Sequence, residues 1–174
     1  MDGALDHDDE EVTAQMRILH WLLRALSDRI MLPLFALLGG TMDTTLGGRL
    51  CVLLTVGARS GQRREVPLNY VPTSEGVGLL AGFGRHAGWV YNLRARPRAA
   101  LLVGGRTYHA TAVELGDRGQ AIAVTRGVLR NAGAMGFFYG WDPRRASDER
   151  VGSVVDETLA FHLVFDETPP WASA

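Results

Sequence analysis

The stretch Thr55-Val-Gly-Ala-Arg-Ser-Gly-Gln-Arg-Arg-Glu-Val-Pro-Leu68 decides how the rest of the chain is arranged. An apolar strand predicted over residues 50–56 leads into a glycine-containing turn, and a second strand leaves through Val66, Pro67 and Leu68. Small residues let backbone N–H groups approach a ligand closely, and guanidinium groups bind phosphate or carboxylate. The stretch is therefore typical of a hairpin that holds an anion, although a polar surface hairpin has the same composition.

Length and composition indicate one globular domain. The chain has 174 residues, of which 47% are hydrophobic and 21% are charged, which suits a folded domain with a substantial core. The net charge of −1 hides an uneven layout. Residues 1–11 carry six acids and no base, whereas residues 59–106 carry eight arginines and two glutamates. A basic excess this small and this local favours a site for a small anion over a surface for nucleic acid.

The residue types exclude several kinds of chemistry. All 18 basic residues are arginine, so mechanisms that need a lysine, such as a pyridoxal phosphate Schiff base, are excluded. The single cysteine, Cys51, lies in an apolar run and is expected to be buried, and it allows no intrachain disulfide. The five histidines are scattered, so no metal site is expected. The sequence has no Gly-x-Ser-x-Gly elbow, and residues 41–168, which are predicted to form a barrel, have no paired carboxylates that would indicate a glycosidase.

The first 40 residues are expected to form an acidic tail and an amphipathic helix. Residues 1–11 are unlike the basic start of a secretory signal, so a cytoplasmic protein is expected. Residues 12–40 place arginines and a histidine at helical spacings of three and four. The apolar run over residues 30–42 is too short to cross a bilayer. This helix either packs on the domain or lies peripherally at the inner face of the plasma membrane.

Short apolar runs bounded by turns predict a barrel domain over residues 41–168, followed by a tail over residues 169–174. The predicted strands are residues 50–56, 65–71, 77–81, 99–103, 107–115 and 159–165. Helices are predicted over residues 89–95 and, capped by Asp117, as far as residue 131. Residues 132–150 are expected to be an aromatic loop with some helix. Strands in successive hairpins with helices around them predict a mainly β, α+β fold, an antiparallel barrel.

A glycine-rich loop, Gly82-Phe-Gly-Arg-His-Ala-Gly88, opens the first of these helices. Trp89 and Asn92 are three residues apart and share one helical face, and an aromatic plane beside an amide suits a flat heteroaromatic ligand. A core tryptophan and a capping asparagine would give the same spacing. The loop lacks the third glycine and the βαβ unit of a dinucleotide-binding motif, so a Rossmann fold is not indicated.

Three motifs that follow one another in the chain make the sequence resemble the deazaflavin-dependent nitroreductase family. Members of this family are oxidoreductases that depend on coenzyme F420. Their fold is a split β-barrel similar to that of the FMN-binding split barrels. The motifs are Leu53-Leu-Thr-Val-Gly-Ala-Arg-Ser-Gly61 with Arg64-Glu-Val-Pro-Leu68, Ala81-Gly-Phe-Gly-Arg-His-Ala-Gly-Trp89, and Trp89-Val-Tyr-Asn-Leu-Arg-Ala-Arg-Pro97. Together they cover roughly residues 50–115. The resemblance implies a split barrel that binds coenzyme F420, an 8-hydroxy-5-deazaflavin.

The resemblance also implies which residues bind the cofactor. Its phosphate and acidic tail would lie against Arg59, Ser60, Gly61 and Arg64, with Arg63 as a further candidate. Ala58 stands where many members of the family carry a second basic residue. The residues expected around the deazaflavin ring are Pro67, Leu68, Gly82, Phe83, Gly84, Trp89 and Asn92.

The implied reaction is hydride transfer from C5 of the reduced deazaflavin to a hydrophobic electrophile, such as a quinone, an enone, an unsaturated lipid or a nitroaromatic. The cofactor carries the hard chemistry, and Tyr139, Tyr91 and His86 are candidate proton donors. Two alternatives stay open: a barrel that binds FMN or haem, and a non-catalytic module that binds a membrane surface. Pairing into a homodimer is expected by analogy with other split barrels.

Overall fold

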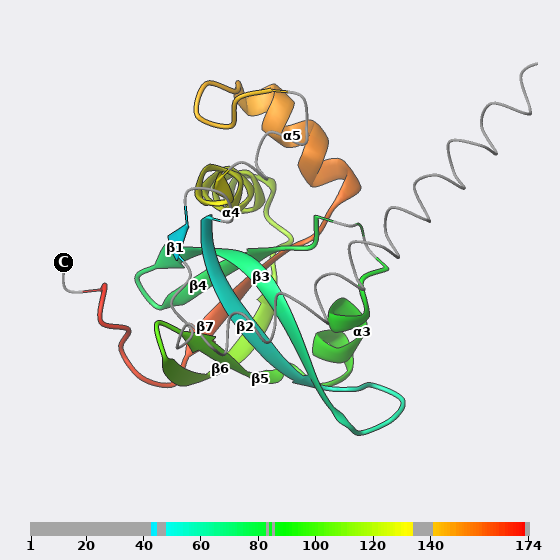
Figure 1. The fold of residues 1–174 in the computed structure, drawn as a ribbon. Helices are drawn as coiled ribbons and strands as arrows, with labels where there is room; N and C mark the ends of the chain where they lie inside the picture. Colours follow the sequence, from blue (N-terminus) through cyan, green and yellow to red (C-terminus); the bar gives the residue numbers. More distant parts are fainter. Residues whose placement is uncertain (1–42, 45–47, 83, 85, 134–140, 173–174) are drawn as a thin grey trace, which may run out of the picture.

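Antiparallel strands form a closed barrel in the computed structural model, which describes residues 43–44, 48–82, 84, 86–133 and 141–172 (Figure 1). The strands are β1 (Asp43–Thr44), β2 (Gly48–Val56), β3 (Arg63–Thr73), β4 (Gly76–Leu80), β5 (Arg98–Val103), β6 (Arg106–Glu114) and β7 (Ala160–Phe165). Among the described residues the order is β1-β2-β3-β4-β7-β6-β5, and β2 also pairs with β5. That pairing closes a six-stranded ring to which β1 is a short addition. The mainly β, α+β barrel predicted from the sequence is confirmed.

Three helices pack around the barrel in the described part of the chain: α3 (Gly88–Ala95), α4 (Arg118–Asn131) and α5 (Asp148–Glu157). Helix α3 lies beside β2, α4 covers β3 and β4, and α5 packs on α4 (Figure 1). The predicted cap of α4 is confirmed, because the Asp117 carboxylate accepts the Gln120 N–H at 2.8 Å. Helix α5 extends beyond the loop predicted to end at residue 150. Its cap, Ser147, accepts the Arg150 N–H at 3.3 Å.

The barrel closes through a short seam between β2 and β5. Only Val52, Leu53 and Leu54 of β2 pair with residues of β5. Beyond Leu54, β2 continues beside β3 alone, with Thr55 opposite Arg64 in the register. The β2–β3 hairpin therefore projects past the barrel wall (Figure 1).

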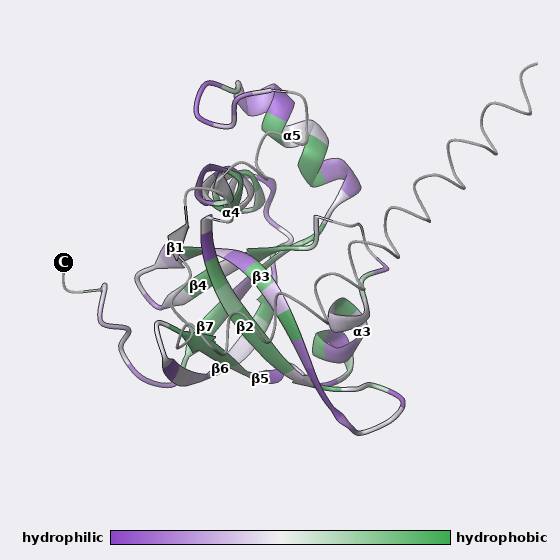
Figure 2. Ribbon diagram, viewed as in Figure 1, coloured by the Kyte–Doolittle hydropathy of each residue, from purple (hydrophilic) through white to green (hydrophobic). Residues whose placement is uncertain are grey.

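Side chains of the strands alternate between the barrel interior and its outer face, as strand geometry requires. The interior holds Cys51, Leu53, Val77, Leu79, Leu101, Val103, Tyr108, Ala110, Phe161, Leu163 and Phe165. Strand β4 is buried on both faces because its outward Gly78 lies under α4, where an added Cβ would sit 2.7 Å from a methyl of Val124. Figure 2 shows mainly hydrophobic residues along β2 and hydrophilic residues in the part of β3 that belongs to the projecting hairpin.

Cys51 is a packing residue of this core. Its side chain is fully buried, and its thiol donates to the Leu68 carbonyl at 3.3 Å. Burial raises the pKa of the Cys51 thiol well above its ordinary value. The predicted buried cysteine is therefore confirmed, and its thiol stays protonated at neutral pH.

Several predictions from the sequence lie outside the described residues. They concern the acidic tail over residues 1–11, the amphipathic helix over residues 12–40, Phe83 and Tyr139. In the described part of the chain, no helix combines the length and the apolar character needed to cross a bilayer.

Candidate functional site

The turn that joins β2 to β3 is held together by its own backbone. The Gly57 N–H donates to the Gln62 carbonyl at 2.8 Å, and the Gly61 N–H donates to the Gly57 carbonyl at 2.9 Å. Gly61 has φ +65°, and an added Cβ there would meet nothing within 4 Å. Within the described residues, the N–H groups of Arg59 and Ser60 have no acceptor. The turn therefore presents two adjacent, open N–H groups beside an uncrowded glycine, an arrangement that suits an anion.

The end of α3 fixes this turn from one side. Asn92 is 9% exposed; its Oδ1 accepts the Ala58 N–H at 2.9 Å, and its Nδ2 donates to the Thr55 hydroxyl at 3.0 Å. Nη1 of Arg96 donates to the Gly57 carbonyl at 3.1 Å. Both ends of the Asn92 amide are thus engaged with the protein, which makes Asn92 a residue that positions the turn.

The described arginines between residues 59 and 106 fall into two groups, those that form an ion pair with a carboxylate and those that do not. Four of them form ion pairs: Arg63 with Glu65 at 3.0 Å, Arg94 with Glu114 at 2.8 Å, Arg98 with Asp166 at 2.7 Å and Arg106 with Glu167 at 2.8 Å. Arg94 donates hydrogen bonds to the Glu114 carboxylate and Arg98 donates to that of Asp166, and these bonds raise the pKa values of Arg94 and Arg98. Within the described residues, Arg59, Arg64 and Arg96 have no carboxylate partner. Within this cluster, the described arginines without a carboxylate partner therefore lie at the β2–β3 turn or reach it.

Strand alternation separates the two adjacent arginines at the start of β3. Arg64 lies opposite Thr55 and shares its face, which is the face that Asn92 contacts. Arg63 lies opposite Val56 on the other face and is paired with Glu65. Among the described residues, the Arg64 side chain bonds only to the Gln62 side chain, at 3.4 Å, so Arg64 is the better placed of the two for an anion at the turn.

The residues predicted around the cofactor ring are more scattered. Trp89 is only 8% exposed and meets Phe161 edge-to-face, with ring centroids 5.3 Å apart. Leu68 packs against the same core, whereas Pro67 lies on the opposite face of β3, beside Val52 in the register. The ring of Trp89 therefore belongs to the core and presents little surface to a ligand.

The glycine loop before α3 leaves room beside it. Gly82 is exposed, and Gly84 has φ +85° with nothing within 4 Å of an added Cβ. The Gly84 N–H donates to the Ala81 carbonyl at 2.9 Å, which anchors the loop to the end of β4.

Two of the three candidate proton donors contact each other. Nδ1 of His86 lies 2.9 Å from the Tyr91 hydroxyl oxygen, within hydrogen-bonding distance. Both side chains are exposed, and their ring planes are 25° apart. A proton can be shared across this bond and exchanged with solvent.

Sequence reasoning missed Arg96 as a residue of this site. The available signal was its spacing, because Arg96 is four residues after Asn92 and such residues neighbour each other on a helix. Its hydrogen bond to the Gly57 carbonyl could not be predicted from the sequence, because the two residues are 39 positions apart.

The residues present at the turn fit an extended anionic group. Three arginines and two backbone N–H groups that have no partner of this kind in the described part of the chain can form hydrogen bonds to phosphate or carboxylate oxygens. In the described part of the chain, no group of three or more His, Cys, Asp or Glu side chains could hold a metal ion.

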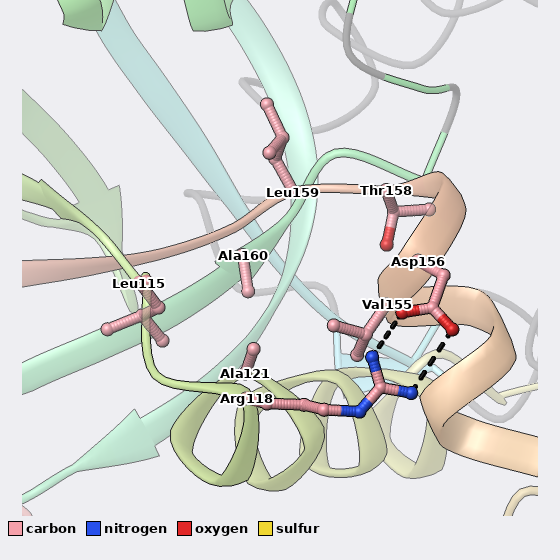
Figure 3. Close-up of a pocket in the computed structure, with 9 residues that line it drawn as sticks. Leu115, Arg118, Ala121, Val155, Asp156, Thr158, Leu159 and Ala160 are labelled. Carbon is pink, nitrogen blue, oxygen red and sulfur yellow. Dashed lines mark hydrogen bonds and ion pairs between the residues drawn. The ribbon is translucent and has the colours of Figure 1, made fainter. Parts of the chain in front are cut away.

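A recess of about 250 Å³ lies elsewhere, between α4, α5 and the start of β7. Leu115, Ala121, Val155 and other small or apolar residues line it (Figure 3). Its charged residues, Arg118 and Asp156, form an ion pair with each other, so this recess offers a ligand no uncompensated charge.

Comparison with known proteins identifies the family of the chain. The profile of the F420H(2)-dependent quinone reductase family matches residues 29–136, more than half of the 174 residues. No curated protein matches the chain by sequence.

Solved structures share the fold. A conserved hypothetical protein from Mycobacterium tuberculosis is 17% identical with a TM-score of 0.52, over 72% of this chain and 78% of that one. A protein of Bacteroides thetaiotaomicron named for 5-nitroimidazole antibiotic resistance is 13% identical with a TM-score of 0.50, over 70% of this chain and 75% of that one. At these identities the likeness establishes only the fold. The family match goes further: the chain belongs to the F420H(2)-dependent quinone reductase family and is an oxidoreductase that uses coenzyme F420.

Proposed function

We propose that the protein transfers a hydride from reduced coenzyme F420 to a hydrophobic electrophile of the quinone class. Enones, unsaturated lipids and nitroaromatics are further candidate acceptors. The family description supports a quinone. The observation that carries the proposal is the β2–β3 turn, where arginines lie together with backbone N–H groups. Among the residues that the structure describes, these arginines have no carboxylate partner and these N–H groups have no acceptor.

In this proposal the residues of the turn bind the acidic tail of the cofactor. Arg59, Arg64 and the N–H groups of Arg59 and Ser60 supply the hydrogen bonds, while Gly61 lets the tail approach the backbone. Asn92 holds the turn in the geometry that these contacts need.

The cofactor ring is proposed to lie between β3 and the glycine loop. Gly82 and Gly84 of the loop, together with Pro67 and Leu68 on the two faces of β3, are candidates to border it, with Phe83 and Trp89 as further predictions. Arg63 stays a prediction for the acidic tail of the cofactor. When bound, the reduced deazaflavin supplies a hydride from C5, and the protein orients the ring and excludes water.

A proton must reach the reduced acceptor, and His86 with Tyr91 is proposed as its source. Their hydrogen bond lets solvent replace a proton that leaves the Tyr91 hydroxyl. Tyr139 stays a prediction because it lies outside the described residues.

Fluorescence titration of the purified protein with coenzyme F420 tests the proposal. Binding at micromolar concentrations is expected, followed by oxidation of the reduced cofactor when a soluble quinone is added. A protein that takes up FMN or haem and leaves F420 unbound would contradict the proposal and favour those alternatives.

Membrane contact and homodimer formation remain predictions. The membrane prediction rests on residues 12–40, which lie outside the described part of the chain. Sedimentation with anionic lipid vesicles, before and after deletion of residues 1–40, tests it, and light scattering tests the dimer.

A further inference from the structure

We propose that Arg96 is a further residue of the anion site and supplies the positive charge that Ala58 does not. The inference rests on the proposed function, because it takes the anion to be the phosphate and carboxylates in the tail of coenzyme F420. It adds a residue at the end of α3 to a site otherwise built by the β2–β3 turn.

Arg96 is anchored at both its backbone and its side chain. It directly follows α3, and its own N–H donates to the Asn92 carbonyl at 2.8 Å. Its side chain then reaches the turn, where Nη1 donates to the Gly57 carbonyl at 3.1 Å. A guanidinium group has five N–H donors, so this bond fixes its position and leaves donors for a ligand.

Arg94, which lies two residues earlier in the last turn of α3, differs from Arg96 in being neutralised. Nε and Nη2 of Arg94 each donate to a Glu114 carboxylate oxygen at 2.8 Å. Glu114 therefore neutralises Arg94 and occupies the fork that would bind an anion. Arg96 has no carboxylate partner among the described residues, so its charge is available.

The guanidinium of Arg96 reaches the turn next to Ala58. Gly57, whose carbonyl holds Arg96, directly precedes Ala58 in the turn. The Ala58 N–H is bound by Asn92 at 2.9 Å, and its side chain is a half-buried methyl. Arg96 thus brings a positive charge from the end of α3 to the turn. It arrives beside Ala58, whose side chain carries no charge.

A matched pair of variants tests the role of Arg96. Fluorescence titration gives the Kd of Arg96→Gln and Arg94→Gln for F420 and for the same deazaflavin lacking its phosphate-bearing tail. Loss of a charge-assisted hydrogen bond is expected to raise the Kd of Arg96→Gln for F420 about tenfold. Its affinity for the tail-less deazaflavin, and both affinities of Arg94→Gln, should stay at the wild-type values.

A rescue variant separates charge from structure. Ala58→Arg combined with Arg96→Gln puts a guanidinium back on the turn and should recover most of the lost affinity. Circular dichroism and thermal melting confirm that each variant is folded. If the double variant binds as weakly as Arg96→Gln, or if Arg96→Gln weakens both deazaflavins equally, Arg96 acts only by holding the turn and the inference is wrong.

The outcomes also separate this inference from the proposed function. If the wild-type protein fails to bind F420, the proposed function is wrong. If the wild-type protein binds F420 and Arg96→Gln binds as tightly as Arg94→Gln does, only the role of Arg96 is wrong.

Discussion

Two arginine-rich regions of this barrel differ in whether their charges are paired. On the flank of β5 and β6, Arg98 and Arg106 form ion pairs with Asp166 and Glu167. At the β2–β3 turn, Arg59 has no carboxylate partner among the described residues. Both regions carry several arginines in the sequence, so arginine content alone cannot locate the site. The difference teaches that available donors, rather than total charge, mark where an anion can bind.

The largest effect is expected when the charge of the turn is reversed. Arg59→Glu combined with Arg64→Glu replaces two donors with two groups that repel the cofactor tail. The Kd for F420 should rise roughly a hundredfold or more, as measured by fluorescence titration.

The matched control for this reversal removes charge from the paired region. Arg98→Gln combined with Arg106→Gln also affects two exposed arginines, but it should leave the Kd for F420 unchanged. Equal losses in the two double variants would show that overall charge matters more than the turn.

A smaller effect is expected when a carboxylate is added to the turn, like the carboxylates of Asp166 and Glu167 that pair with the arginines of β5 and β6. Ala58→Glu places a carboxylate beside the unpaired arginines, where it competes with the tail of the cofactor. The Kd should rise about tenfold, whereas Ala58→Gln should change it little. An unchanged Kd in the Glu variant would contradict the placement of the anion at this turn.

The next prediction concerns the residue that positions the turn. Asn92→Ala leaves the Thr55 hydroxyl and the Ala58 N–H without their partner, which should cost about 1–3 kcal/mol of stability. The loosened turn should also weaken F420 binding about fivefold. Thr55→Val removes only one of the two bonds and should have a smaller effect on both quantities, measured by denaturant unfolding and by titration.

The smallest effect is expected on the paired flank, as a change in acid stability. The Arg98 guanidinium lowers the pKa of Asp166 below its ordinary value of about 3.9. The pair therefore stabilises the fold at neutral pH, and this contribution is lost as the pH falls through the lowered pKa. Asp166→Asn should melt slightly below the wild type at pH 7, and the gap should shrink below about pH 4. A gap that widens in acid would contradict this assignment.

Much of the fold was predictable because local pattern and tertiary structure agree. The run predicted as a strand over residues 50–56 is β2, Gly48–Val56, and the last predicted strand is β7, Ala160–Phe165. Apolar runs bounded by glycine or proline turns mark such strands regardless of their partners. Helix α5 was less visible, since its buried residues are only Val151, Gly152 and Val154.

The site was less predictable because it depends on contacts between distant residues. The turn could be recognised from its glycines and arginines, but the partners that neutralise the other arginines could not. Asp166 lies 68 residues from Arg98, and Glu167 lies 61 residues from Arg106. The spacing of Trp89 fitted a ligand-facing ring and a core ring equally well, and only packing on Phe161 distinguishes them.

The burial of Cys51 has a practical use in site-directed labelling. A thiol that is fully buried and protonated reacts slowly with maleimide reagents, and the chain has no other cysteine. A cysteine introduced at the exposed Ser60 would therefore carry a dye at one defined position without removal of the native residue. Such a conjugate would report optically on the turn while the core stays unmodified.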